Sequence, residues 1–370
     1  MTDIKETASH ELPHVGVDLA KNVIQIAYRD LKTGKFINKQ LSRSKFKEFI
    51  CDCNQRYVIA MEACGACHYW ARLCKEHGHE PMIIPSEVTH GLNIGNKDDH
   101  NDARTIWQAS SIPDLKLIRC RSEENQVEGM LLKLRDLILK QQTQLSNFLR
   151  AQLYELGVAC NMGQTNVAAG ANKLLDEAKE KGAEWSEPFE KLVTAITNIQ
   201  EKLSDSEQTI ADCIIDRTEK NELCERLRSI PYVGPMCAAA LANVMGDPHN
   251  FSNGRQFADY CGMAPYHTGT GGKVNVLGIA DKGNRTLKRV LYEASLSLYC
   301  RVRKDAAEHK ARQYRSDWIL NLMNRKPTKK AVCAIANRLC RIAWAAAAES
   351  EGIYDPSKTT LVRAVDETVG

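Results

Sequence analysis

Three short β-like apolar runs near the N-terminus are separated by the more polar segments AKN and LKTG, a pattern that predicts a meander of antiparallel strands. Further apolar runs and segments with helical spacing follow them. The predicted strands are HVGVDLA (14–20), VIQIAYRD (23–30), GKFINKQL (34–41), RYVIAMEA (56–63) and EPMIIP (80–85), and the predicted helices are SKFKEFICDCN (44–54) and HYWARLCKEHG (68–78). This order predicts a mixed α/β layer in which helices pack on a sheet.

From residue 125 to 157 the apolar residues change to alternating steps of three and four, which predicts a long helix with a coiled-coil stripe. Its members are Val127, Leu131, Leu134, Ile138, Gln141, Leu145, Phe148 and Gln152. A second stripe contains Leu192, Ile196, Ile199, Leu203, Ser206, Ile210 and Cys213. The segment GQTNVAAGANK between them is expected to be a turn or flexible loop. The two helices are expected to fold back as a hairpin or to pair between subunits, and packing within a helical bundle is the alternative.

After Leu227 the chain reads RSIPYVGPMCAAALANVMGD, which predicts a tight turn between two helices. The turn resembles a helix-hairpin-helix motif and could present backbone N–H groups to a phosphate. A glycine-rich segment and further helices follow, up to about Glu349. The expected domains are an α/β domain (12–122), a coiled-coil helical region (123–225), a mainly helical C-terminal domain (226–350) and a tail (351–370).

Composition is that of a soluble globular protein, with 43% hydrophobic and 26% charged residues in 370. No apolar run approaches membrane-spanning length, and the polar N-terminal residues lack the apolar core of a signal peptide. The 14 cysteines are scattered singly through apolar segments, which favours a reducing compartment over a disulfide framework. We therefore expect a cytoplasmic protein.

Charge is distributed unevenly along the chain. The segment from Arg255 to Arg341 has 18 Lys and Arg against 6 Asp and Glu, although the whole chain has a net charge of only +4. The rest of the chain is therefore acidic. A basic C-terminal third indicates a polyanionic partner, and solvated basic helices are the alternative.

Isolated acids in apolar surroundings are the candidate chemistry. Asp18 lies inside the strand VGVDLA and Glu62 ends the strand VIAMEA, where an unpaired carboxylate would be costly. The stretch NKDDHNDAR adds Asp99 and Asp102, which a helix would place on one face. If the two strands are neighbours, four carboxylates converge, and hard oxygen ligands of this kind suit a two-metal nuclease-like centre. Taken singly, each acid is more typical of a structural role.

Three segments, GVDLAKN, MEACGACHYWA and NKDDHNDA, resemble the acidic motifs of the DEDD transposases of the insertion-sequence one-ten family. Two C-terminal segments, GGKVNVLGIADKGNRTLKRVLYEAS and RKPTKKAVCAIANRLCRIAWA, resemble that family's second, transposase domain, particularly in its one-one-one-one subgroup. The resemblance covers nearly the whole chain. It implies an α/β RuvC-like (RNase H-like) N-terminal domain and a C-terminal transposase domain, on either side of the central coiled coil that the apolar stripes predict.

The same resemblance implies an RNA-guided recombinase that inserts and excises a mobile element. Its partners would be element and target DNA, a non-coding guide RNA, and further copies of the chain in dimers or tetramers. The four catalytic acids correspond to Asp18, Glu62, Asp99 and Asp102, which would bind Mg²⁺ or Mn²⁺. Asp98 is an additional acid at a position that the family often fills with another polar residue.

The family places a serine nucleophile just before Gly-Gly-Lys, whereas this chain reads HTGTGGK and has Thr270 there. Threonine has the same hydroxyl, but its β-methyl restricts rotation. Thr268 is a second candidate, and a glycine turn with incidental hydroxyls is the structural alternative. The predicted phosphate contacts are Lys273, Lys282, Arg285, Lys288 and Arg289.

Other functions fit parts of this pattern. One is a non-catalytic nucleic-acid-binding protein derived from a transposase, and another is a metal-dependent, structure-specific nuclease that uses only the acids. Cys64 and Cys67 with His77 and His79 could form a zinc site, but the spacing is poor and a strand-to-helix turn explains the motif. There is no P-loop sequence, which argues against ATP dependence.

Overall fold

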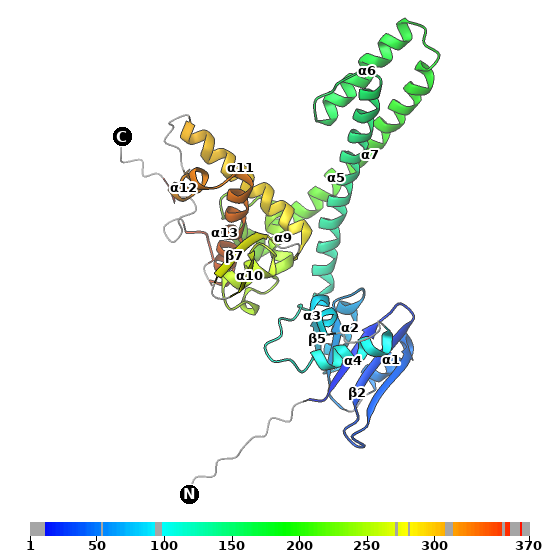
Figure 1. The fold of residues 1–370 in the computed structure, drawn as a ribbon, viewed down its shortest axis with the longest axis vertical. Helices are drawn as coiled ribbons and strands as arrows, with labels where there is room; N and C mark the ends of the chain where they lie inside the picture. Colours follow the sequence, from blue (N-terminus) through cyan, green and yellow to red (C-terminus); the bar gives the residue numbers. More distant parts are fainter. Residues whose placement is uncertain are drawn as a thin grey trace. The chain divides into compact units, whose positions relative to one another are not determined.

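The computed structural model describes residues 12–52, 55–92, 98–270, 273–279, 282–307, 314–349, 352–355 and 363–364. The chain divides into two units, Met1–Glu124 and Asn125–Gly370 (Figure 1). The first is a mixed α/β sheet domain and the second is mostly helical, as the hydrophobic pattern predicts. The finer division into four domains stays a prediction.

A five-stranded sheet with the order β3-β2-β1-β4-β5 forms the centre of the first unit. β1, β2 and β3 are antiparallel neighbours, whereas β4 and β5 run parallel to β1. The elements are β1 (His14–Leu19), β2 (Val23–Arg29), β3 (Phe36–Ser42), α1 (Arg43–Cys51), β4 (Val58–Glu62), α2 (Cys67–Glu76), β5 (Glu80–Ile84), α3 (Ser86–Leu92) and α4 (Asp99–Ala109). The five strands and the first two helices coincide with the predicted segments.

The two faces of the sheet are covered by different helices, because side chains alternate along each strand. Val15 and Val17 of β1 point to one face, where Phe46 of α1 and Trp70 of α2 complete the main core of this unit. Gly16 points to the other face, against α4. Asp18, two residues further along β1, belongs to this second face.

In the second unit, α5 (Glu123–Glu155) and α7 (Ser186–Glu219) are long helices that pair with each other. Three side-chain pairs join them: Arg217 with Glu128 at 3.1 Å, Arg135 with Glu207 at 2.7 Å, and Gln200 with Ser146 at 3.0 Å. Residue numbers rise along one helix as they fall along the other, so the two form an antiparallel hairpin. This is one of the arrangements that the sequence left open, and supercoiling of the pair stays a prediction.

The buried side of α5 differs from the predicted stripe. Val127, Leu134 and Phe148 are each more than 40% exposed. The buried apolar residues are Leu132, Ile138, Leu149 and Leu153. Leu149 and Leu153 belong to a small core that also contains residues of α6 (Gln164–Glu180). Because α5 packs against α6 as well as α7, its buried face differs from the stripe expected for a pair of helices.

The expectation that GQTNVAAGANK is a turn or flexible loop is wrong, because most of this segment is the first half of α6. Val167, Ala171, Leu174, Leu175 and Ala178 form a stripe with helical spacing, and all five are buried. Gly170 permits a close contact, since a Cβ atom there would lie 2.2 Å from the sulfur of Cys160. Tertiary packing of small residues therefore overrides the loop-like composition.

A helical body follows the arm of α5, α6 and α7. Its elements are α8 (Glu222–Arg228), α9 (Pro235–Met245), the 3₁₀ turn η1 (Pro248–Asn250), α10 (Gly254–Tyr260), β6 (Pro265–Thr270), β7 (Lys273–Ile279), α11 (Arg285–Ala307), β8 (Tyr314–Arg315), α12 (Asp317–Arg325), α13 (Thr328–Ala348) and β9 (Arg363–Ala364). The expectation that no apolar run approaches membrane-spanning length is wrong for α13, which among the described residues is the one helix long and apolar enough. Half of its apolar window is buried in this body, however. We interpret α13 as a core helix.

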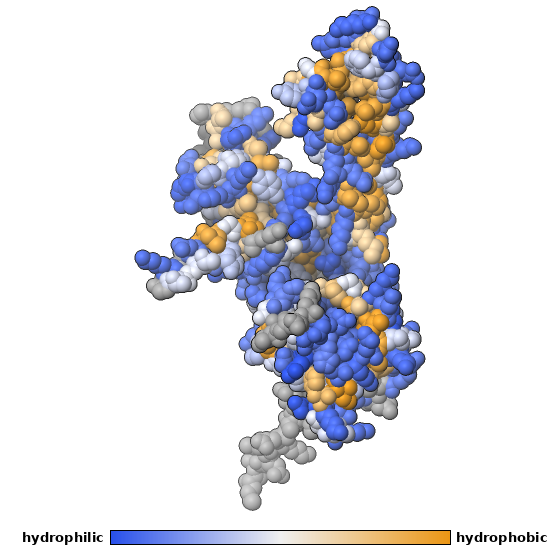
Figure 2. Space-filling model, turned by 45° about the vertical axis from the view of Figure 1, so that its right-hand side comes forward, coloured by the Kyte–Doolittle hydropathy of each residue, from blue (hydrophilic) through white to orange (hydrophobic). Residues whose placement is uncertain are grey.

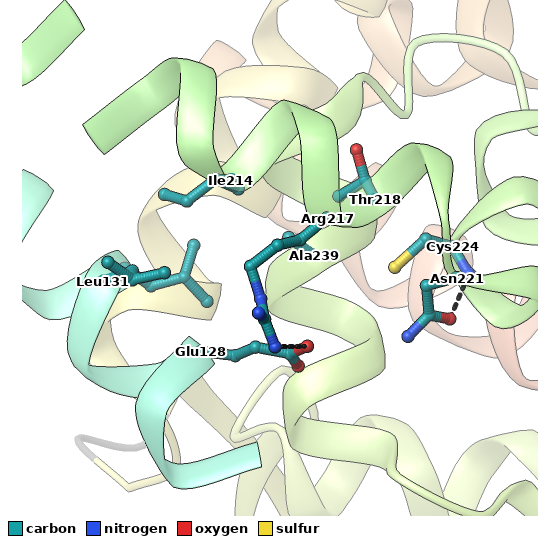
Figure 3. Close-up of a pocket in the computed structure, with 9 residues that line it drawn as sticks. Glu128, Leu131, Ile214, Arg217, Thr218, Asn221, Cys224 and Ala239 are labelled. Carbon is teal, nitrogen blue, oxygen red and sulfur yellow. Dashed lines mark hydrogen bonds and ion pairs between the residues drawn. The ribbon is translucent and has the colours of Figure 1, made fainter. Parts of the chain in front are cut away.

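The arm joins the helical body through a mixed polar and apolar contact, shown in Figure 3. Arg217 extends from α7 to the carboxylate of Glu128 on α5, beside Ile214 and Ala239. The cavity between them measures about 20 Å³, roughly the volume that one water molecule needs. The thiol of Cys224 faces this region, and burial raises its pKa to about 12. The base of the arm is thus an integral part of the second unit's core.

Candidate active site

Asp18 and Glu62 lie at the ends of neighbouring parallel strands. β1 and β4 are paired in register through Val17 and Met61, so Asp18 and Glu62 are the next residues of the two strands. Residues at matching positions of adjacent strands point to the same face. Both carboxylates therefore reach the same edge of the sheet, on the face that α4 covers.

The acidic segment that follows has two separate roles. Asp98 is the N-cap of α4, and its carboxylate accepts the backbone N–H of Asn101 at 2.8 Å. Asp99 and Asp102 lie in the first turn, three residues apart and on one side of the helix. Asp98 thus stabilises the start of the helix, while Asp99 and Asp102 act together on Asp18.

Gly16 allows α4 to lie directly on β1. A Cβ atom at Gly16 would be only 2.4 Å from the carbonyl oxygen of Ala103 and 2.4 Å from the backbone nitrogen of Trp107. No other residue fits this contact without moving the helix. Ala103 directly follows Asp102, so the contact determines how closely the acids of α4 approach Asp18.

A chain of hydrogen bonds ties the first turn of α4 to the sheet. Gln25 lies opposite Asp18 in β2 and is buried. Its Nε2 donates to Oδ1 of Asn38 on β3 at 2.6 Å, and Nδ2 of Asn38 donates to the carbonyl oxygen of His100 at 2.8 Å. His100 is inside the turn that carries the two helical acids, so this chain holds the turn over the sheet.

The acids act on one another electrostatically. The pKa of Asp18 is raised to about 6, chiefly because burial disfavours its charged form, and then because Asp99, Asp102 and Glu62 repel a further negative charge. The backbone N–H of Leu19 opposes the shift. The negative charges of Asp99, Asp102 and Glu62 therefore all raise the pKa of Asp18.

Two neutral groups border the site. The hydroxyl of Thr89 on α3 donates to Oε2 of Glu62 at 2.8 Å and so fixes that carboxylate. The pKa of the Cys64 thiol is raised to about 11 by burial, by Cys67, and by the carboxylates of Glu62 and Asp18. At neutral pH this thiol is uncharged and adds nothing to the repulsion.

The donor chemistry of the four carboxylates fits a hard divalent cation, which prefers oxygen ligands. Among the residues that the structure describes, however, no three His, Cys, Asp or Glu side chains are grouped closely enough to form a ready ligand shell. Carboxylates that repel one another stay apart until a cation offsets their charge. The site thus has the residues for a metal, held in an open arrangement.

The CxxC and histidine residues serve the fold. His79 is buried, its Nε2 lies 3.0 Å from the carbonyl oxygen of Ile50, and its Nδ1 accepts the N–H of Tyr57 at 3.2 Å. Cys67 is buried at the start of α2. Each described cysteine is a free thiol. His79 thus joins the end of α1 to Tyr57, while Cys64 and Cys67 lie at the turn from β4 to α2. Neither arrangement supports a zinc site among the described residues.

Thr270 is the last residue of β6, in the second unit, and it is exposed. It lies opposite Lys273 in the two-stranded sheet of β6 and β7. The flanking residues 271 and 272 are outside the described part of the chain. Thr268 is also exposed, two residues earlier on the same strand. The structure therefore presents both hydroxyls on the exposed strand β6.

Several of the predicted phosphate contacts have partners within the chain. Lys282 pairs with Asp259 at 2.8 Å, and Nζ of Lys288 donates to the carbonyl oxygen of Lys282 at 3.2 Å. Arg289 pairs with Asp136 of α5 and with Glu293. Lys273 is exposed on β7, and Arg285 is the first residue of α11. A nucleic-acid role for all five stays a prediction.

Sequence patterns did not single out Gly16, Gln25, Asn38 or Thr89 as parts of the site. Gly16 is two residues before Asp18, and a glycine inside a strand signals close approach of another backbone. That signal was present in the sequence. Asn38 and Thr89 carry no comparable signal, because their partners depend on how β3 and α3 pack.

Comparison with known proteins identifies the family. The chain is 30% identical over 340 residues to a putative transposase of Sinorhizobium fredii, covering 90% of this chain and 84% of that protein. The chain belongs to the IS116/IS110/IS902 transposase family. The family model itself matches residues 224–311, in the helical body. The chain is also 27% identical to the transposase for insertion sequence element IS1328 of Yersinia enterocolitica and 29% identical to that for IS1111A of Coxiella burnetii, covering 95% and 88% of those proteins and 89% and 90% of this chain.

The Gly16 contact can be tested through stability. Gly16→Ala should destabilise the first unit by about 1–3 kcal/mol, because its Cβ atom forces α4 away from β1. The measurement is denaturant unfolding, followed by a probe in the first unit. Gly91→Ala is the matched control, since a Cβ atom at Gly91 has nothing within 4 Å. Equal stability of Gly16→Ala and wild type would contradict the close contact.

The repulsion around Asp18 predicts a pH-dependent gain in stability for Asp18→Asn. The native pKa of about 6 lies above the usual value of 3.8, so ionisation opposes folding as pH rises through this interval. Without divalent cations, the variant should be about 1–2 kcal/mol more stable than wild type above pH 6, after allowance for solvent screening. The gain should vanish below pH 4.

Asp30→Asn is the control for this titration. The pKa of Asp30 is lowered by hydrogen bonds from the backbone of Lys32 and Thr33, so removing its charge should bring no gain at neutral pH. Thermal unfolding between pH 4 and pH 8 measures both variants. A gain for Asp18→Asn that is independent of pH would mean that charge repulsion is not its cause.

Proposed function

We propose that this protein is a DNA transposase of an insertion sequence, a recombinase that cuts and rejoins DNA strands. The relatives named as transposases match the chain over about 90% of its length. The observation that carries the proposal is the placement of Asp18 and Glu62 on adjacent strands, with the acids of α4 acting on Asp18. A recombinase of this kind works on DNA in the cytoplasm.

The acids would hold Mg²⁺, for which Mn²⁺ can substitute, through Asp18, Glu62, Asp99 and Asp102. When bound, the cation would neutralise charge that develops on the transferring phosphate. The chain's own residues position the carboxylates for this task. Gly16 sets the distance of α4 from the sheet, and Asn38 holds its first turn. The RuvC-like classification of this domain is part of the proposal.

Thr270 is proposed as the nucleophile. Its Oγ1 would form an ester bond to the scissile phosphorus as the bond from phosphorus to a DNA oxygen breaks, and that oxygen leaves with the electron pair. The hydroxyl proton passes to a base or water, and the leaving oxygen takes up a proton. Exposure at the end of β6 makes the hydroxyl accessible to DNA. The β-methyl of threonine makes this attack slower than that of a serine.

Nucleic-acid binding is assigned to the second unit, with element DNA, target DNA and a guide RNA as partners. The turn between α8 and α9 has features that suit a phosphate. Tyr232 has a positive φ of 66°, Gly234 caps α9 without a side-chain hydrogen bond, and Pro235 begins the helix. A Cβ atom at Gly234 has open space around it, so a ligand can approach. Sequence choice would rest with pairing to the guide RNA.

A homo-oligomer is also proposed, because strand exchange needs more than one active centre. Figure 2 shows apolar side chains on the surface of the arm. On α5, Val127, Met130, Leu134 and Leu137 are all exposed and follow steps of three and four. A row of this spacing fits a helix of a second copy.

A non-catalytic nucleic-acid-binding protein is the second candidate function, favoured by the threonine in place of the family's serine. A structure-specific nuclease that uses only the acids is intermediate between the two. Incubation of the full chain with guide RNA, Mg²⁺ and labelled element DNA separates the three. A covalent protein–DNA adduct indicates a recombinase, free hydrolysed ends indicate a nuclease, and a mobility shift without cleavage indicates a binding protein.

The acids can be tested with two neighbouring residues. Asp99→Asn should lower DNA cleavage at least about 100-fold, because it removes an anionic metal ligand. Asp98→Asn is the matched control, since asparagine caps a helix as well as aspartate does, and it should cleave at close to the wild-type rate. Equal activity of the two variants would rule out the assignment of Asp99.

The nucleophile is tested by the adduct. Thr270→Val preserves shape and removes the hydroxyl, so the adduct should disappear while nucleic-acid binding persists. Thr270→Ser removes only the β-methyl and should match or exceed the wild-type rate. Thr268→Val is the control and should have a smaller effect. The measurement is the labelled adduct on a denaturing gel, and an undiminished adduct in Thr270→Val would transfer the role to another hydroxyl.

A further inference from the structure

A groove lies between the start of α10 and one face of α13, with a volume of about 610 Å³. Three arginines line it: Arg255 of α10, and Arg338 and Arg341 of α13. Trp344 and Tyr354 also line it. The groove is large enough for more than a single phosphate group, and its cationic groups are all guanidinium forks.

The helical spacing of α13 builds one wall. Arg338, Arg341 and Ala345 follow steps of three and four, so they lie on one face of the helix. Leu339, Cys340 and Ala343 lie on the opposite face and are fully buried in the core of the body. Since the buried face fixes the rotation of α13, the two arginines are held toward the groove.

Gly254 brings the third arginine to this wall. A Cβ atom at Gly254 would lie 2.9 Å from the carbonyl oxygen and 3.0 Å from the Cα atom of Arg341. The glycine therefore lets α10 contact the backbone of α13, and it places Arg255, the next residue, beside the arginines of α13. The close contact is part of a built site rather than a chance gathering of surface charge.

The charges of the groove favour an anion. Burial lowers the pKa of Arg338, and the neighbouring positive charge of Arg341 lowers it further. The guanidinium of Arg338 is also held over the ring of Trp318, 4.6 Å from its centroid. Glu349 and Asp355 also line the groove, so the lining has three positive and two negative groups. An entering phosphate would relieve repulsion between Arg338 and Arg341.

We propose that this groove binds a phosphodiester strand of nucleic acid, with Arg255 and Arg341 donating to its phosphates and Arg338 fixed beside them by Trp318. The inference rests on the proposed function, which requires nucleic-acid binding, and it adds a surface to it. Arginine forks match phosphate oxygens in two-point contacts, and a volume of about 610 Å³ admits more than one phosphate group of a strand.

The test measures the salt dependence of binding by the full chain. The probes are a fluorescent single-stranded DNA, an RNA of the same sequence and the corresponding DNA duplex. Arg255→Gln combined with Arg341→Gln should lower affinity by about tenfold near physiological salt and reduce the slope of log K against log salt by about 1 to 2. The probe that loses affinity identifies DNA or RNA as the ligand of the groove.

Arg303→Gln combined with Lys304→Gln is the matched control, because both residues are exposed on α11 and the same charge is removed. It should change affinity and slope much less. If the control variant weakens binding as much as the groove variant does, the proposal is overturned, because the overall positive charge of the protein would then explain both losses. Unchanged binding by the groove variant would also overturn it.

Gly254→Ala retains every charge but forces Arg255 away from Arg341, so it should weaken binding without changing net charge. Thermal unfolding shows whether the body is still folded in this variant. Different outcomes of this experiment contradict the proposed function and the proposed groove. A wild-type chain that binds none of the probes contradicts nucleic-acid binding as such, whereas a wild type that binds and a groove variant that binds equally well contradict only the groove.

Discussion

The absence of one side chain determines the geometry of the first unit. Because Gly16 has no Cβ atom, the backbone of α4 lies against β1 at a distance that no larger residue permits. This contact brings Asp99 and Asp102 within electrostatic range of Asp18. The hydrogen bonds from Gln25 through Asn38 to His100 then fix the helix along the sheet. Backbone packing therefore sets where the first turn of α4 lies, and the carboxylates are held near Asp18 although they repel it.

The sequence predicted the fold where periodicity and burial agree. All five strands of the sheet were predicted as short β-like runs between polar segments, and these runs match the structure. Prediction failed where tertiary packing decides. α6 looked like a loop because of its small and polar residues, yet Val167 and Leu174 bury it against neighbouring helices. The stripe of α5 was partly wrong for a related reason, since α6 draws Leu149 and Leu153 into a core that a two-helix pattern does not contain.

The charged residues of the candidate site could be identified from the sequence, but their arrangement could not. A carboxylate within an apolar strand is costly, so Asp18 and Glu62 stand out from sequence alone. The sequence of each strand does not show that the two carboxylates are close together. That follows only from the order of strands in the sheet, in which β1 and β4 are parallel neighbours. The separate role of Asp98 was also hidden. Three aspartates in five positions look alike, and only the N-cap contact with Asn101 separates the one that stabilises the helix from the two beside Asp18.

Charge counting along the sequence overstates the surface that is open to a polyanion. The basic segment has 18 Lys and Arg, but Lys282, Arg289 and Arg301 are in ion pairs within the second unit. Arg289 pairs with Asp136 of α5, so part of the basic excess holds the arm to the body rather than facing solvent. Arg255 and Arg341 differ, because backbone packing at Gly254 and burial of the opposite face of α13 direct them into a groove. What makes a basic residue a candidate for phosphate binding is therefore the packing that orients it, which net charge cannot reveal.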